Sequence, residues 1–174
     1  MKPRFALAAV LLAVALSAPA QRKNDPLTDL EISQLRDAAL EPEQRLKLYV
    51  EFARARLVSL EQMRSDPKAT DRAQKTHALL EDFLTIYDEL NDNIDNFESR
   101  KDDLRRALKP VIEGDTDFQA KLRALKDSAS AKPGEAKEYE FTLSNAIETV
   151  DNAATDHREL LVEQEEAAKH KKKH

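Results

Sequence analysis

The side chains of this chain that could do chemistry fall into three groups: a core histidine, a row of carboxylates and a basic C-terminus. His157 is the only histidine at a position that the heptad pattern assigns to a core. Such a residue could bind a metal or respond to pH, but a core histidine is more often held by a hydrogen bond. We therefore expect a buried, hydrogen-bonded His157 and assign it no metal.

Carboxylates recur every seven residues in the segment 67–109. The row consists of Glu81, Asp88, Asp95 and Asp102. A spacing of seven places them on one face of a helix, and a solvated face is the ordinary explanation. The functional alternative is an interaction stripe for a basic partner or divalent cations. Calcium binding of the EF-hand kind is excluded because the Asp-rich loop with its glycine is missing.

The C-terminus changes abruptly from an acidic run at 163–166 to a basic run at 169–174. The basic run contains Lys169, Lys171, Lys172 and Lys173, with His170 and His174 four residues apart. Contact with an anionic surface is the functional alternative to a solubilising tail. Whether the histidine pair or His157 binds a metal stays open. The tail lacks the interleaved aromatic residues of nucleic-acid-binding segments, so no nucleic-acid partner is expected.

Motifs of the common enzyme and cofactor classes are missing from the sequence. There is no cysteine for covalent haem, and the Glu-x-x-His spacing of di-iron bundles does not occur. Two glycines cannot build a phosphate-binding loop or a nucleophile elbow. A haem held by His157 and Met63 is a remote alternative. We therefore expect no catalytic residues, no cofactor and no enzymatic activity.

Residues 1–20 have the pattern of a cleavable secretory signal peptide. Lys2 and Arg4 precede an apolar run of about 12 residues, and Ala18 and Ala20 occupy the small-residue positions before the cut. The run is too short to span a bilayer, so no stable transmembrane segment is expected after cleavage. We expect cleavage after Ala20 and a periplasmic or secreted protein. The lack of cysteines and glycosylation sequons favours a bacterial envelope.

The remaining composition is typical of long helices. Charged residues make up 35% of the chain, glycine occurs twice, and tryptophan is absent. Loss of the two cations in the signal peptide moves the net charge from −5 to about −7. A capping box at Thr28 and Glu31, and the prolines Pro42 and Pro67, predict three helix starts.

Heptad patterns predict how these helices pack. From 76 to 108 the heptad core positions follow one another at alternating spacings of four and three residues, and Lys101 is the only charged residue among them. This pattern predicts one helix over 67–109. Pro110 and Gly114 are expected to end it, before a short helix near 116–125. The last helix carries two apolar stripes, which indicates two neighbours.

We therefore predict an elongated all-α antiparallel bundle over residues 21–168, followed by a basic tail at 169–174. It comprises three long helical arms and two short helices, with packing like that of a coiled coil.

The segment from Leu27 to Glu31, followed by Gln34-Leu35-Arg36, resembles the Leu-Thr-x-x-Gln motif of the helical periplasmic stress chaperones Spy and CpxP. The resemblance covers about ten residues, with Glu31 in place of the glutamine. It implies a chaperone-like or stress-sensing protein as an alternative function. The function that we favour is a non-enzymatic exported interaction or scaffold protein, with a protein or an anionic envelope surface as its partner. A metal or haem binder is the remote alternative.

Overall fold

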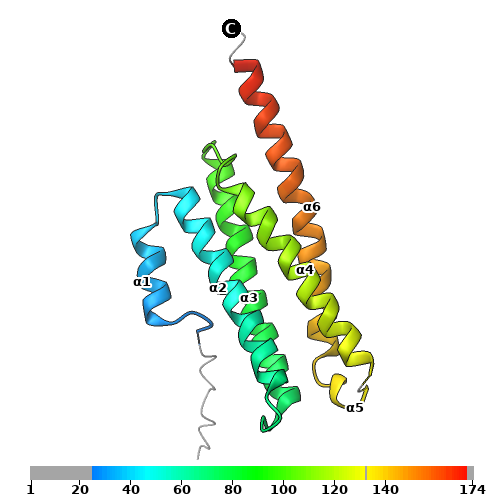
Figure 1. Cartoon of the computed structure of the whole chain (residues 1–174). Helices are drawn as coiled ribbons and strands as arrows, with labels where there is room; N and C mark the ends of the chain where they lie inside the picture. The colour runs from blue at the N-terminus through cyan, green and yellow to red at the C-terminus, as the bar shows by residue number, and fades with distance from the viewer. Residues whose placement is uncertain (1–24, 132, 172–174) are drawn as a thin grey trace, which may run out of the picture.

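The computed structural model describes residues 25–131 and 133–171, and within these ranges every regular element is a helix (Figure 1). The helices are α1 (Asp29–Asp37), α2 (Pro42–Ser65), α3 (Arg72–Ser99), α4 (Leu108–Ser130), α5 (Pro133–Ala136) and α6 (Glu140–Lys171). The predicted all-α class is confirmed. In the described ranges no helix combines the length and the apolar character needed to cross a bilayer. The predicted signal peptide lies outside the described residues.

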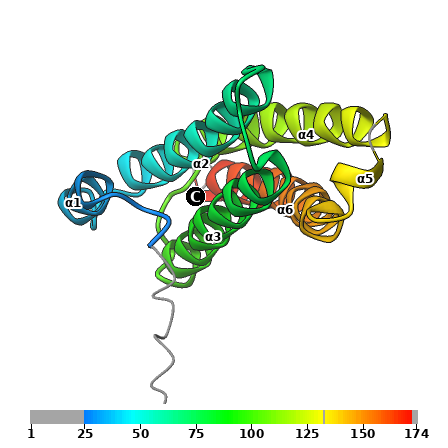
Figure 2. The same cartoon turned by 90° about the horizontal axis from the view of Figure 1, so that it is seen from below.

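The four long helices of the described chain form an elongated bundle of two hairpins. Helices α2 and α3 pack against each other in opposite directions, and so do α4 and α6. The hairpins meet with α4 beside α2 and α6 beside α3. Figure 2 shows the resulting two layers, α2 with α4 and α3 with α6. Antiparallel packing therefore holds within each hairpin, whereas neighbours from different hairpins run parallel.

The prediction of a single helix over 67–109, and with it the count of three long arms, is wrong. The chain leaves α3 after Ser99 and resumes helical structure only at Leu108, so the described chain has four long helices. Lys101 adopts the left-handed region, with φ 62°, and its side chain is exposed. A continued heptad would have directed this ammonium into the core, where burial of an unpaired charge is costly. The connection instead carries the chain across the bundle, so that α4 lies beside α2.

Pro110 and Gly114 lie inside α4 and do not end a helix. Pro110 is the third residue of α4, in the first turn, where no intrahelical bond needs its missing N–H. Gly114 is buried, and a Cβ built there would lie 2.7 Å from Val50 Cγ1 on α2. The predicted helix start at Thr116 also falls within α4. Gly114 therefore allows the close approach of α2 and α4.

Gly114→Ala is expected to lower the free energy of unfolding by about 1 kcal/mol, although alanine is the better helix former. The gain in helix propensity is about 1 kcal/mol, whereas overpacking against a stiff valine costs about 1–3 kcal/mol. In a Val50→Ala background the same change should become stabilising, because the clash is removed. Urea denaturation of the four proteins in this cycle measures the coupling. An identical effect of Gly114→Ala in both backgrounds would contradict the steric role of Gly114.

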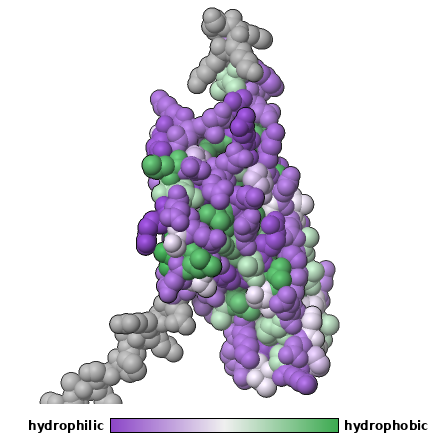
Figure 3. All heavy atoms as spheres, turned by 60° about the vertical axis from the view of Figure 1, so that its left-hand side comes forward, coloured by the Kyte–Doolittle hydropathy of each residue, from purple (hydrophilic) through white to green (hydrophobic). Residues whose placement is uncertain are grey.

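Helix α1 lies on the outer side of α2 and is held there by two arginines. The predicted capping box is confirmed: Thr28 N donates to Glu31 Oε2 at 2.7 Å, and Glu31 N donates to Thr28 Oγ1 at 3.3 Å. Arg56 forms a largely buried ion pair with Glu31 at 2.6 Å, and Arg45 donates to the Leu35 carbonyl. The α1 side of the molecule is mostly hydrophilic, with apolar residues among the polar ones (Figure 3).

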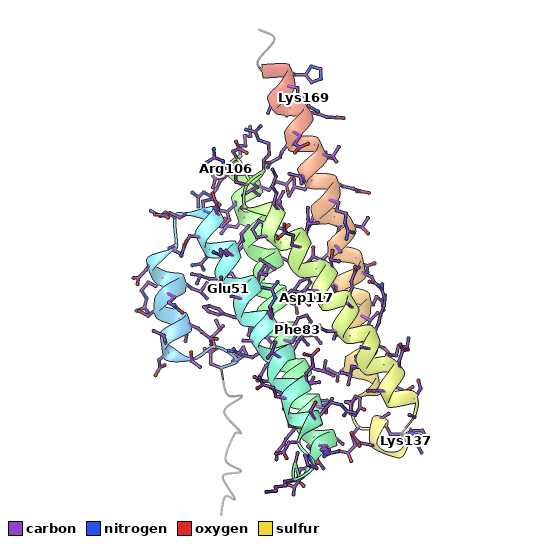
Figure 4. The ribbon with its side chains drawn as sticks, in the orientation of Figure 1. Glu51, Phe83, Arg106, Asp117, Lys137 and Lys169 are labelled. Atoms are coloured by element: carbon purple, nitrogen blue, oxygen red, sulfur yellow. The ribbon has the colours of Figure 1, made fainter. Side chains whose placement is uncertain are left out.

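Aromatic rings fill the core where the two hairpins meet. Phe83 and Tyr87 of α3 pack against Phe118 of α4, with ring centroids 5.3–5.9 Å apart. All three side chains are fully buried. Figure 4 shows Phe83 within the bundle, between the hairpins. This cluster sets the spacing of α3 and α4 next to the buried hydrogen bond between Tyr87 and Asp115.

Candidate functional site

A chain of buried hydrogen bonds joins α3, α4 and α6. Tyr87 Oη donates to Asp115 Oδ1 at 2.7 Å, and His157 Nδ1 lies 2.9 Å from Asp115 Oδ2. Tyr87 and Asp115 are fully buried, and His157 is 3% exposed. The expectation of a buried, hydrogen-bonded His157 is therefore confirmed. One carboxylate fixes the relative positions of three helices.

The chemistry of Asp115 determines which ring nitrogen of His157 carries a proton. A carboxylate can only accept, so Asp115 takes hydrogen bonds from the phenol and from His157 Nδ1–H. Burial, reinforced by the charge of Asp115, raises the pKa of Tyr87 far above its usual value, so the phenol remains a donor. In the neutral ring Nε2 then has a free lone pair. Nε2 has no hydrogen-bond partner in the described part of the chain.

His157 also lines an acidic groove of about 520 Å³ between α3 and α6. Its lining residues come from α3 and α6, the two helices that form one layer in Figure 2. Five carboxylates line it, and no lysine or arginine does: Asp95, Glu98, Asp156, Glu159 and Glu163. The apolar part of its lining comes from Ile94, Ala153 and Leu160, and its remaining polar residues are Asn91, Thr149 and Asn152.

The five carboxylates of the groove have no basic partner among the described residues. Some acidic residues on other faces are paired, for example Asp117 with Arg54 at 3.0 Å and Asp151 with Arg123 at 2.7 Å. Unpaired charges of one sign in a concave surface produce a strong local potential. The groove is therefore suited to a positively charged partner.

The fold divides the predicted row of carboxylates. Glu81 and Asp88 are exposed on α3 outside the groove, and Asp95 lines it. Asp102 lies beyond the end of α3, in the connection to α4, where it pairs with Arg100 at 3.3 Å. The prediction of one four-residue stripe is thus wrong, because the chain leaves the helix before Asp102.

Two parts of the site were missed by the sequence reasoning, although each had a signal. Asp156, Glu159 and Glu163 stand at spacings of three and four, which places them on one helix face. Asp115 continues the heptad that runs from Val111 to Leu125 and is the one charged residue in it. A carboxylate at a heptad core position indicates a buried hydrogen-bond network.

The first residues of the basic tail lie on the end of α6 that extends away from the bundle (Figure 4). Lys169 is exposed on the last turns of α6, which project past the other helices, and Arg106 lies at the same end of the molecule (Figure 4). Helix α6 continues to Lys171, so the predicted boundary at 168 is not a helix end. Lys172 and Lys173 lie outside the described residues, as does His174 of the predicted histidine pair.

The described residues contain no group of three or more His, Cys, Asp or Glu side chains placed to hold a metal ion. The carboxylates of the groove are therefore spread along its walls and do not converge on one point. Comparisons of the chain with protein-family models, curated proteins and solved structures find no match.

Proposed function

We propose that this chain is an exported, non-enzymatic interaction protein of the bacterial envelope that binds a basic segment of a partner protein in the α3/α6 groove. The observation that carries the proposal is the lining of the groove, with five unpaired carboxylates, no cation and an apolar strip. Complementary charge attracts and orients a basic partner. The apolar strip suits the aliphatic stems of lysine and arginine, which pack on apolar surface while their charged ends reach carboxylates.

The dimensions of the groove favour a peptide segment as its ligand. Its α6 wall extends from Thr149 to Glu163, which corresponds to about 21 Å along a helix. Acidic residues recur along this wall, so several cations of one segment can be bound together. The buried contacts of Asp115 hold α6 against α3 and α4. Walls that are already in place reduce the cost of ordering on binding.

The basic tail provides a second contact in this proposal. Lys169 lies beyond the groove on the projecting end of α6, so the tail and the groove can engage different partners. An anionic envelope surface is the partner class that suits the tail. A protein that joins a basic partner to such a surface would act as a scaffold.

A lysine-rich amphipathic peptide of about 15 residues, long enough to form a helix, is expected to bind the groove. Its affinity should fall as the salt concentration rises above about 0.15 M, because screening weakens exposed charge pairs. Asp156→Lys combined with Glu163→Lys should weaken binding at least about tenfold, since each change turns an attraction into a repulsion. Fluorescence anisotropy of a labelled peptide measures the affinity.

The matched control places the same charge change on another face. Glu43→Lys combined with Glu51→Lys alters two exposed residues of α2 and should leave peptide binding within about twofold. Equal loss in both double variants would mean that only net charge matters, and the groove would not be the site. Suppression of aggregation of an unfolded client without any peptide binding would favour the chaperone-like alternative.

A further inference from the structure

We infer that His157 determines the specificity of the α3/α6 groove, because its Nε2 accepts a hydrogen bond from the ammonium group of a partner's lysine. The inference rests on the proposed function and adds to it. Carboxylates attract any positive charge and also accept from N–H groups, whereas a neutral acceptor adds affinity only for a cation that carries N–H donors.

The orientation of the His157 ring is the first support. Its Nδ1 is held by Asp115, which is itself held by Tyr87 in the core. The ring is 97% buried, yet it lines the groove, and its Nε2 has no partner among the described residues. Nε2 is not one of the buried side-chain atoms that lack a hydrogen-bond partner, so it stays accessible from the groove. A donor supplied by the partner would meet an acceptor whose position Asp115 already fixes.

A second acceptor without a donor lines the same groove. Asn91 Oδ1 on α3 is buried and has no hydrogen-bond partner among the described residues. The groove lining therefore includes Nε2 of His157 on one wall and Oδ1 of Asn91 on the other, together with the carboxylates of Asp95 and Asp156. Acceptors outnumber donors in this set, whose donors come from the Asn91 amide nitrogen, so its complement is a group rich in donors.

A lysine ammonium fits this acceptor set better than a guanidinium does. An ammonium is a compact charge with three rotatable N–H donors, so it can direct one of them at a single acceptor such as Nε2. A guanidinium is a planar fork that is best matched by one carboxylate in a bidentate pair. Asp115 from α4 contacts the ring, and Asp95 from α3 and Asp156 from α6 line the same groove.

The test compares two peptides on two proteins. One peptide is the lysine-rich probe described above, and the other replaces each lysine by trimethyl-lysine, which keeps the charge but has no N–H donor. The protein variant is His157→Asn, whose amide nitrogen can still donate to Asp115 but which has no atom at the position of Nε2. The native protein should bind the lysine peptide about tenfold more tightly, as expected for a hydrogen bond to a charged group. His157→Asn should show a smaller preference for the lysine peptide, because only the carboxylates and Asn91 then accept from its N–H groups.

Several outcomes would overturn the inference. Equal binding of the two peptides by the native protein would mean that the groove selects charge alone, and the proposed function would still stand. Preservation of the tenfold preference in a folded His157→Asn protein would exclude Nε2 as the acceptor. Tighter binding of an arginine version of the probe would contradict the preference for lysine. If neither peptide binds the native protein, the proposed function fails as well.

The folding of the variant needs its own control. Thermal melting should show that His157→Asn remains folded, because its amide keeps the hydrogen bond to Asp115. If it does not fold, Asn91→Ala serves as the second variant, because it removes the other neutral acceptor without touching Asp115. Asn91→Ala should reduce the preference for the lysine peptide, and an unchanged preference would contradict the acceptor set proposed here.

Discussion

Asp115→Ala is expected to lower the free energy of unfolding by about 3–5 kcal/mol, the range found when one partner of a buried charged contact is removed. The change leaves the Tyr87 hydroxyl and His157 Nδ1–H buried without an acceptor, and it disconnects three helices at once. Urea denaturation followed by circular dichroism measures the loss. Because domains of this size are stable by only about 5–15 kcal/mol, the variant should melt at a much lower temperature.

Two neighbouring substitutions provide the controls for Asp115. Asp115→Asn keeps an acceptor for the phenol, so it should cost less than the alanine change. Asp117→Ala removes a partly exposed carboxylate on the same helix, paired with Arg54, and should cost less than about 1 kcal/mol. Equal losses for Asp115→Ala and Asp117→Ala would show that the buried network contributes nothing to stability.

Leu90→Asp is expected to unfold the protein. Leu90 is fully buried in the middle of α3. An ionised carboxylate there would lose its hydration without a charged partner, at a cost of several kcal/mol or more, and the core would also lose the packing of leucine. The expected observation is loss of the helical circular dichroism signal at 25 °C, or the absence of a cooperative melting transition.

The control for Leu90→Asp makes the same substitution at an exposed leucine. Leu40 is 78% exposed in the turn between α1 and α2, so Leu40→Asp should change stability by no more than about 0.5 kcal/mol. A Leu90→Asp protein that melts like the parent would contradict the position of Leu90 in the core.

Some features that depend on a few consecutive residues were predictable from the sequence, although the helix predicted to start at Pro67 begins only at Arg72. The capping box at Thr28 and the helix start at Pro42 are present as expected, because the groups that stabilise a helix start lie within about four residues of one another. The core positions of α3 from Thr76 to Phe97 are also buried as the heptad predicts. Periodicity determines which face of a helix is apolar, and burial follows from the hydrophobic effect whatever the neighbour is.

Features that depend on contacts between distant residues were decided by the tertiary structure. The heptad pattern runs through Lys101 without a gap in spacing, but the chain leaves the helix there because burying the ammonium would cost more than a break. Considered without its neighbours in space, Gly114 predicts the end of a helix. Its role inside α4 depends on Val50, which belongs to another helix 64 positions earlier in the chain.

The candidate site illustrates the same division. The sequence by itself determined that residues near Asp95 and near Asp156 are carboxylates on helices, and that His157 takes a core position. Only the tertiary structure brought the two walls together and placed Asp115 against the imidazole, because these contacts join positions about 40 to 60 residues apart. Helical periodicity has no information about such pairs. These contacts form because the four apolar helix faces pack in the arrangement that buries the most surface and still leaves the buried charges paired.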